Sequence, residues 1–281
     1  MEPATRMTLP AENKKAMVLG IPVDALDMET ALSRIETMLA ARHRGYVCFV
    51  GVHGIMEAQR DPSLAQVYAH ATLRIPDGMP TVWMGWQQGL STMRRVAGPD
   101  LMLEMLSGKQ FAHHRHFLYG GKPGVAEELR HNLTHRYPWV EIVGTFTPPF
   151  RDLTLEEEDA LASQVSAVRP DIIWVGISTP KQERFMMRMM PRLDCSLAFG
   201  VGAAFDFHTG RIKDCPQWVK SAGMQWFHRL VQDPKHLMGR YLRCNFGFLW
   251  KISLQLSGLR DFPQAKTDSQ LRIDRSTVPG G

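Results

Sequence analysis

The residue best placed for acid–base chemistry is Asp77, in the segment Ile75-Pro76-Asp77-Gly78. We expect residues 72–75 to form a short strand ending at Pro76, so that the carboxylate follows the strand directly. Open α/β sheets bind their ligands at the carboxyl ends of the strands. An aspartate at that edge can accept a proton from a sugar hydroxyl. An ordinary Asp-Gly turn contains the same residues, and the spacing alone favours that simpler interpretation.

A second candidate is the segment Ser178-Thr179-Pro180-Lys181-Gln182-Glu183, which we expect to open a helix. The free N–H groups of a helix N-terminus bind anions, and Lys181 adds positive charge there. The structural alternative is strong, because Gln182 stands three residues after Thr179 and the pair matches a capping box. Taken alone, the segment therefore indicates only a helix start.

Two glycine-rich segments would let the backbone approach a diphosphate closely. The first follows a predicted strand and includes Gly121 and Gly124, and the second has Gly200 and Gly202 ahead of Asp206. Tight turns between strands and helices explain these glycines about equally well. Neither segment matches the dinucleotide pattern GxGxxG, which argues against a nicotinamide-dependent dehydrogenase.

The sequence predicts neither a metal ion nor a cofactor. No Asp-x-Asp occurs in the chain, whereas many nucleotide-sugar transferases hold a divalent metal on the diphosphate with such carboxylates. Cys48, Cys195, Cys215 and Cys244 are far apart, which argues against a zinc site or a disulfide framework and fits a reducing compartment. Arginine, lysine or backbone N–H groups would then have to neutralise a diphosphate leaving group.

Short apolar runs alternate with helical patterns between residues 46 and 200 and predict the elements that position these residues. Strands are expected at 46–50, 72–75, 115–119, 139–143, 171–177 and 196–200. Helices are expected up to about His70, up to about Arg136, at 154–168 after a Thr154–Glu157 capping box, and after Thr179. This alternation predicts βαβ units and hence an α/β fold with a mainly parallel sheet.

The C-terminal part of the chain differs in composition and in predicted secondary structure. Strand signals stop after residue 210, and a long helix is expected from about Pro234 to Leu259. Residues 211–261 contain nine lysines and arginines but three acidic residues, a net charge of +6 against +5 for the whole chain. Such a segment predicts an anionic partner: phosphates, anionic lipid or nucleic acid.

Aromatic residues interleave with these basic residues, and glutamate is absent, which is typical of a helix at a membrane interface. The alternative is the solvated face of a core helix. We expect the membrane contact to be made by Arg243, Phe246, Phe248, Trp250 and Lys251. No apolar run is long enough to span a bilayer, and residues 1–15 lack the apolar run of a secretory signal. A cytoplasmic protein, peripheral on the inner face of the cell membrane, is therefore predicted.

Taken together in order, the motifs resemble those of the WecG/TagA/CpsF family, glycosyltransferase family 26. The resemblance covers about residues 20–245. The matching segments are 56–62 (MEAQRDP), 76–80 (PDGMP), 95–100 (RVAGPD), 121–124 (GKPG), 148–150 (PPF), 180–183 (PKQE), 200–206 (GVGAAFD), Trp226, 229–230 (RL), 234–235 (PK) and 240–242 (RYL).

The resemblance implies a Rossmann-like core with a C-terminal helical appendage that docks on the membrane and completes the site. We accordingly expect a catalytic core at residues 1–210, flexible over 1–15, an appendage at 211–262 and a disordered tail at 263–281. It also implies a metal-independent, inverting transferase that uses a UDP-sugar. The implied acceptor is a sugar linked to undecaprenyl diphosphate.

By matching motif, Asp77 takes the role of catalytic base, and Arg95 and Gln182 take polar positions around the donor and acceptor. Arg229 and Arg240 correspond to appendage arginines near the donor diphosphate. The remaining substrate-binding residues implied by these motifs are Gly78, Gly121, Lys181, Gly202 and Asp206.

The chain departs from the family pattern at several positions. Where many members have Thr-x-Asn, this chain has Phe49-Val50-Gly51, so that His53 is expected to substitute for the asparagine. Gln225 replaces a glutamate, and His236 replaces a frequent arginine. These changes suggest a donor or acceptor different from that of the N-acetylmannosamine-transferring members. The sequence around His53 looks more like the exopolysaccharide branch, including glucosyltransferases of xanthan-type assembly.

The expected mechanism is direct displacement of UDP by an acceptor hydroxyl that Asp77 deprotonates. One alternative is a non-catalytic nucleotide-sugar-binding scaffold of the same fold, because the Thr-x-Asn pattern is lost. A nucleic-acid-binding protein is less favoured, because aromatic residues share the basic helix and no nucleic-acid motif is present. The expected partners are a UDP-sugar, a polyprenyl-diphosphate-linked sugar and the inner membrane surface, and a homo-oligomer remains compatible with the sequence.

Overall fold

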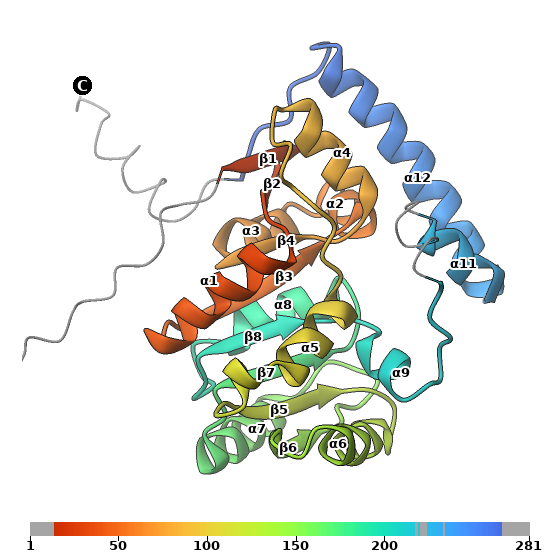
Figure 1. Cartoon of the computed structure of the whole chain (residues 1–281). Coiled ribbons are helices and arrows are strands. Elements are labelled where there is room, and N and C mark those ends of the chain that lie inside the picture. Colours follow the sequence, from red (N-terminus) through yellow and green to blue (C-terminus); the bar gives the residue numbers. More distant parts are fainter. Residues whose placement is uncertain (1–13, 217–218, 220–223, 233, 266–281) are drawn as a thin grey trace, which may run out of the picture.

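A six-stranded sheet forms the centre of the computed structural model, which describes residues 14–216, 219, 224–232 and 234–265 (Figure 1). All neighbouring strands are parallel, in the order β4-β3-β8-β7-β5-β6. The strands are β3 (Gly45–Val50), β4 (Leu73–Pro76), β5 (Arg115–Gly120), β6 (Glu141–Phe146), β7 (Ile172–Gly176) and β8 (Leu197–Gly200). The predicted α/β fold with a mainly parallel sheet is therefore confirmed.

Helices cover both faces of the sheet and bury alternate strand residues. In β7, Ile173 and Val175 pack on one side, whereas Ile172 and Trp174 pack on the other. The first face is covered by α2 (Val52–Ala58), α3 (Pro62–His70), α7 (Leu155–Val168) and α8 (Lys181–Met189). The second face is covered by α1 (Met28–Ala40), α5 (Gly98–Ser107), α6 (Val125–Arg136) and α9 (Ala204–His208), with the 3-10 turn η1 (Lys109–Phe111). Burial on both faces explains why the strands are continuously apolar.

Most predicted elements lie within a few residues of their observed positions. The Thr154–Glu157 capping box is present at the start of α7. The helical stretch expected up to His70 is two helices, because the side chain of Asp61 caps a new helix at the backbone N–H of Ser63. The strand expected at 139–143 begins at Glu141 instead and runs to Phe146.

An N-terminal hairpin lies beside the main sheet and was not anticipated from the sequence. It consists of β1 (Lys15–Val18) and β2 (Ile21–Asp24), joined by Leu19 and Gly20, both of which have positive φ. Two central residues with positive φ characterise the tight turns that match strand twist. The buried carboxylate of Asp24 accepts hydrogen bonds from Arg74 and so ties this hairpin to β4.

Two further helices, α4 (Met79–Gln87) and α12 (Pro234–Leu256), lie on the hairpin side of the molecule, with α11 (Gln225–Gln232) next to α12 (Figure 1). In α12, Cys244, Phe248 and Ile252 recur every fourth residue and are buried in the same apolar cluster as α2 and the hairpin. At its C-terminal end, Gln255 donates to the carbonyl of Met17 at 2.8 Å and accepts from the Leu19 N–H at 2.7 Å.

One face of the C-terminal half of α12 is therefore part of the core. The expectation for Phe248 needs a correction: its side chain is 4% exposed and points into the protein instead of toward a membrane. Residues 1–13 and 266–281, expected to be flexible or disordered, lie outside the described residues. None of the described helices combines the length and the apolar character needed to cross a membrane.

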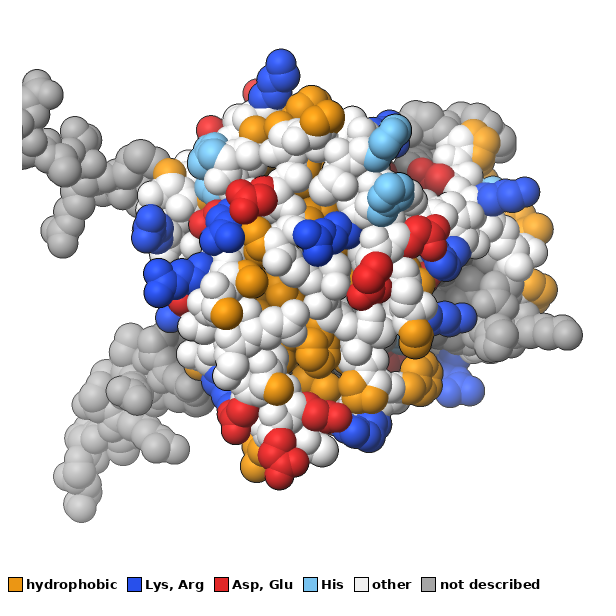
Figure 2. Space-filling model, turned by 90° about the horizontal axis from the view of Figure 1, so that it is seen from below, with side chains coloured by type: hydrophobic (Ala, Val, Ile, Leu, Met, Phe, Trp, Pro, Cys, Tyr) orange, Lys and Arg blue, Asp and Glu red, His pale blue; other side chains and the backbone are white. Residues whose placement is uncertain are grey.

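The face opposite α12 carries charges of both signs. Figure 2 shows lysine and arginine side chains interspersed there with acidic and apolar ones. This mixture agrees with the net charge of −2 that the sequence places in residues 1–210. This face therefore lacks the uniform positive charge that would attract a polyanion.

Candidate active site

A cavity of about 850 Å³ opens at the carboxyl edge of the sheet. Gly51 borders it after β3, Asp77 after β4, Thr179 after β7 and Gly202 after β8. Parallel strands deliver all their C-terminal loops to the same edge, which is where α/β sheets bind ligands. The carboxylate that the sequence singled out is thus part of a real cavity.

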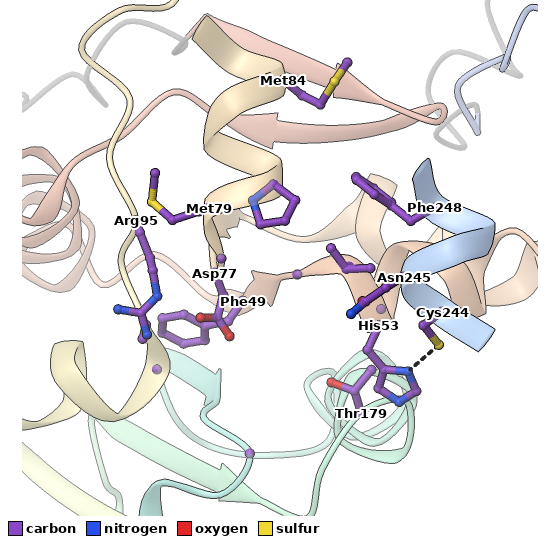
Figure 3. A pocket seen from close by; sticks show the side chains of 18 of the residues that line it. Phe49, His53, Asp77, Met79, Met84, Arg95, Thr179, Cys244, Asn245 and Phe248 are labelled. Carbon is purple, nitrogen blue, oxygen red and sulfur yellow. Dashed lines mark hydrogen bonds between the residues drawn. The ribbon is translucent and has the colours of Figure 1, made fainter. Parts of the chain in front are cut away.

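The opposite wall of the cavity is apolar and comes from α4 and α12. From α4 it receives Trp83 and Met84, and from α12 it receives Phe248, Leu249 and Ile252 (Figure 3). Trp83 and Leu249 are also exposed to solvent, so the apolar wall continues to the rim. The cavity therefore joins a polar floor to an apolar exit.

Asp77 is held firmly at the junction of two strands. Its N–H donates to the carbonyl of Val50 at the end of β3, with an N···O distance of 3.0 Å. A Cβ at Gly51 would lie 2.5 Å from the Asp77 carbonyl oxygen, so only glycine fits there. Gly78, with φ of 127°, then turns the chain into α4. Gly51 and Gly78 therefore allow the backbone to take the shape that this loop around Asp77 requires.

Arg95 contributes a cationic group to the same part of the cavity. Its side chain is 13% exposed and lies 3.5 Å from a carboxylate oxygen of Asp100. In Figure 3 the guanidinium of Arg95 and the carboxylate of Asp77 point toward a common region. A base and a cation are thus available to one bound ligand.

Five helices begin at the cavity: α2, α4, α5, α8 and α9. In the part of the chain that the structure describes, none of the five has a side-chain hydrogen bond capping its N-terminus. Side chains do cap α1, α3 and α7, which do not begin at the cavity. Uncapped N-terminal N–H groups and helix dipoles favour an anion. This convergence suits a diphosphate.

Gln182 does not form the capping box that its spacing suggested. The residue at the N-cap of α8 is Pro180, and Thr179 makes no cap. The Gln182 amide instead donates to the carbonyl of Gly200 at 2.8 Å and accepts from the N–H of Gly202 at 3.0 Å. The side chain therefore clamps the loop after β7 to the loop after β8 across the cavity floor.

Glu183 supports this clamp from below and was quoted in the sequence motif without a role. Its Oε1 accepts from the Thr179 hydroxyl at 2.8 Å and from the Gln182 amide at 3.1 Å. Its Oε2 and the hydroxyl of Tyr68 are buried without a hydrogen-bond partner among the described residues. Burial raises the pKa of Glu183, so its carboxyl group keeps its proton to a higher pH than an exposed glutamate would.

The structure brings some of the expected substrate-binding residues together and leaves others apart. The cavity is lined by His53, Asp77, Gly78, Arg95, Gln182 and Gly202. Gly121, Lys181 and Asp206 do not line it: Gly121 faces Val125, Asp206 lies in α9, and the Lys181 ammonium lies 5.3 Å from the ring centre of Phe150. Arg229 and Arg240 belong to α11 and α12, but their side chains lie outside the described part of the structure.

Apart from Phe246 and Phe248, which were expected at the membrane, the α12 residues that line the cavity were not anticipated as site residues. Asn245 points from α12 into the cavity, and Cys244 lies beside His53 (Figure 3). The fourfold spacing of Cys244, Phe248 and Ile252 was the available signal, because it marks the inner face of the helix. Of the expected membrane residues, Arg243, Phe246 and Trp250 are exposed, whereas Lys251 is half-buried near the Phe262 ring.

His53 is turned toward a neighbouring thiol and carboxylate. Its Nδ1 lies 3.8 Å from the Cys244 sulfur and 4.0 Å from a carboxylate oxygen of Glu57. Within the described residues, these three form a group whose N, O and S atoms lie within 4.8 Å of one another, close enough to share a metal ion. The expected role of His53 in place of a substrate-binding asparagine stays a prediction.

We expect Glu183→Gln to retain stability at pH 5 and to become increasingly favourable relative to wild type as the pH rises toward 8. The folded protein holds the carboxyl proton above its ordinary pKa, so wild type loses stability over this range, by about 1.4 kcal/mol per pKa unit. The amide has no proton to lose. Urea unfolding at both pH values measures the difference. As a control, Glu183→Ala leaves Thr179 and Gln182 without their acceptor and should lower the stability at both pH values. If Glu183→Gln lowered the stability equally at both pH values, a raised pKa of Glu183 would be contradicted.

Comparison with known proteins agrees with this geometry. The family model for the glycosyl transferase WecG/TagA/CpsF family matches residues 16–261. A Bacillus subtilis (strain 168) protein is 27% identical over 177 residues, which cover 63% of this chain and 67% of the relative. A Bacillus spizizenii (strain W23) protein is 25% identical over 219 residues, which cover 76% and 83%. Both relatives are named N-acetylglucosaminyldiphosphoundecaprenol N-acetyl-beta-D-mannosaminyltransferase. The chain belongs to the WecG/TagA/CpsF family and is a glycosyltransferase.

Proposed function

We propose that this glycosyltransferase moves a hexose from a UDP-sugar to a sugar linked to polyprenyl diphosphate, in bacterial surface or exopolysaccharide synthesis. The transferred sugar is glucose or a sugar of the N-acetylmannosamine type. The observation that carries the proposal is the joining of a polar floor, with Asp77 and Arg95, to the apolar wall of α4 and α12 in one cavity. An acceptor that combines a diphospho-sugar with an isoprenoid chain has the same two-part character.

The apolar wall supports the lipid part of this acceptor. Trp83, Leu249 and Leu256 line the cavity and remain exposed, so apolar surface extends from the floor to the outside. A water-soluble sugar acceptor would leave this wall uncovered, whereas an isoprenoid chain would bury it. The two Bacillus relatives are named for a diphosphoundecaprenol acceptor, which agrees with this assignment.

The chemistry follows from the polar floor. Asp77 takes the proton from the acceptor hydroxyl as its oxygen forms a bond to the anomeric carbon, and the bond from that carbon to the UDP oxygen breaks on the opposite face. The anomeric configuration is therefore inverted. The charge on departing UDP is met by Arg95 and by the uncapped helix N-termini, joined by Arg229 and Arg240 as the family resemblance implies. Catalysis by this route needs no metal ion.

We further propose that the exposed face of α12 contacts the inner surface of the cell membrane. Phe246 and Trp250 are 70% and 67% exposed, and the basic side chain of Arg243 lies near them on the helix. Aromatic rings bury apolar area at the lipid interface, and each basic residue near an anionic leaflet contributes roughly 1 kcal/mol. Such contact would place the open apolar end of the cavity near its lipid substrate.

The donor and acceptor are tested in one assay with EDTA present. UDP-glucose and UDP-N-acetylmannosamine are each incubated with a short-chain polyprenyl-diphospho-sugar, and UDP release and the linkage of the product are measured. We expect one donor to support turnover, and the product to carry inverted stereochemistry. Turnover that requires added Mg²⁺ or Mn²⁺ would contradict the metal-free mechanism, and equal turnover with a free sugar would contradict the lipid-linked acceptor.

Asp77→Asn should lower kcat by about 10²–10⁴-fold, because the amide keeps the shape of the carboxylate but cannot accept the proton. Asp194→Asn is the matched control, since it makes the same change at an exposed aspartate outside the cavity. Both variants are compared with wild type by UDP release and by thermal unfolding. More than about a tenth of wild-type kcat in a folded Asp77→Asn variant would remove Asp77 from the role of base.

Trp250→Ala should weaken sedimentation with anionic liposomes and lower activity on lipid acceptors, while activity on a water-soluble acceptor analogue is retained. Phe150→Ala is the control, because Phe150 is a fully exposed aromatic residue in a different part of the fold. Raising the salt concentration should also release the wild type, since exposed charges are screened within about 8 Å at physiological ionic strength. Unchanged sedimentation of Trp250→Ala would exclude this face as the membrane contact.

A further inference from the structure

Two helices that are far apart in the sequence bring together a thiol, an imidazole and a carboxylate. His53 and Glu57 stand four residues apart on α2 and therefore share a face. Cys244 faces His53 from α12 (Figure 3). The Cys244 sulfur lies 3.8 Å from His53 Nδ1, which lies 4.0 Å from Glu57 Oε1. The three ligand atoms all lie within 4.8 Å of one another.

These separations are close to those of a bound zinc ion. Zinc–sulfur bonds of about 2.3 Å and zinc–nitrogen or zinc–oxygen bonds of about 2.0–2.1 Å place tetrahedral ligand atoms about 3.3–3.6 Å apart. The observed S···N and N···O distances of 3.8 and 4.0 Å are longer than these values, and the third pair, the Cys244 sulfur and a Glu57 oxygen, lies within 4.8 Å. Metal binding therefore requires the three side chains to move closer together.

The types of ligand also select the ion. A thiolate and an imidazole are soft or borderline donors, which suit Zn²⁺ and do not suit Mg²⁺ or Ca²⁺. The set of one Cys, one His and one Glu has the three protein ligands typical of an open zinc site, in which a fourth position is taken by water or another ligand. His53 and Cys244 both line the cavity, so the site borders it.

We propose that His53, Glu57 and Cys244 form a zinc-binding site that fastens α12 to α2. The site stands apart from Asp77 and Arg95 within the cavity (Figure 3). It goes beyond the proposed function and does not depend on it, because no step of sugar transfer uses the ion. Bound zinc would fix the position of α12, which carries part of the apolar wall.

A zinc ion could reach this site from solvent, and Arg60 competes with it for one of the ligands. The side chains of His53 and Glu57 are 29% and 27% exposed, which provides a path for the ion, whereas Cys244 is buried. Arg60 competes, because its guanidinium donates to Glu57 Oε1 at 2.9 Å. Zinc binding therefore has to displace Arg60 or use the second carboxylate oxygen of Glu57.

The first experiment titrates tag-free, full-length protein with Co²⁺, whose thiolate complexes absorb by sulfur-to-metal charge transfer, and then displaces it with Zn²⁺. We expect one equivalent to produce the band in wild type. Cys244→Ser should abolish it, while Cys195→Ser, the same change at a buried cysteine outside the group, should leave it intact. Absence of the band in wild type, or its persistence in Cys244→Ser, would overturn the proposal.

Two variants change the affinity in opposite directions while all cysteines are kept. Loss of groups that merely orient metal ligands costs about 10–100-fold in affinity, so Glu57→Gln, which alters a ligand, should weaken Zn²⁺ binding at least tenfold. Arg60→Ala should strengthen binding, because it removes the competitor of the ion. Calorimetry measures both, and a decrease on Arg60→Ala or no change on Glu57→Gln would contradict the assigned ligands.

Hydrogen exchange then tests the fastening of α12. Zn²⁺ should slow exchange in the Cys244 to Ile252 part of α12 in wild type and leave it unchanged in Cys244→Ser, because the ion joins the two helices only through this thiolate. Equal slowing in both proteins would show that zinc acts elsewhere. The zinc tests measure metal binding and hydrogen exchange and do not measure turnover, so failure of either proposal would be recognised separately.

Discussion

All six strands of the central sheet run in the same direction, and every connection between them must return across a face of the sheet. The loops after the strands and the first turns of the following helices therefore gather at one edge. Asp77, Gln182 and Gly202 reach one cavity for this reason, although more than a hundred residues separate the first from the last. The same constraint aims the uncapped N-termini of α2, α4, α8 and α9 at the cavity, and α5, which follows α4, adds a fifth; together they give an anionic ligand its favourable surroundings.

Much of this arrangement was predictable because it is recorded locally in the sequence. Strands buried on both faces leave continuous apolar runs, and the Thr154–Glu157 capping box is a contact between near neighbours. The position of Asp77 followed from a short strand and the direction rule of parallel sheets. The N-terminal hairpin escaped notice because its turn, Leu19-Gly20, places a leucine at positive φ, where leucine is rarely found.

The remaining features depend on contacts between distant segments, which local patterns do not report. The spacing of Gln182 fitted a helix cap, but the loop after β8 offered its amide better partners in Gly200 and Gly202. Basic and aromatic residues in α12 indicated an interface, yet periodicity does not say which face packs against protein. Phe248 was consequently assigned to the membrane, whereas it packs in the core, and the proximity of Cys244 to His53 could not be seen at all.

The two faces of α12 have a mechanical consequence. A helix of 23 residues is a rod about 35 Å long, and its side chains keep their angular positions around the axis. Gln255 pins the end of the rod to the N-terminal hairpin, while Trp250 is exposed outside the cavity, Phe248 and Ile252 are buried against it, and the exposed Phe246 lies at its rim. Because the helix is stiff, a tilt of α12 about this pinned end would move its outer and inner side chains together. Such a tilt would also change the width of the apolar exit.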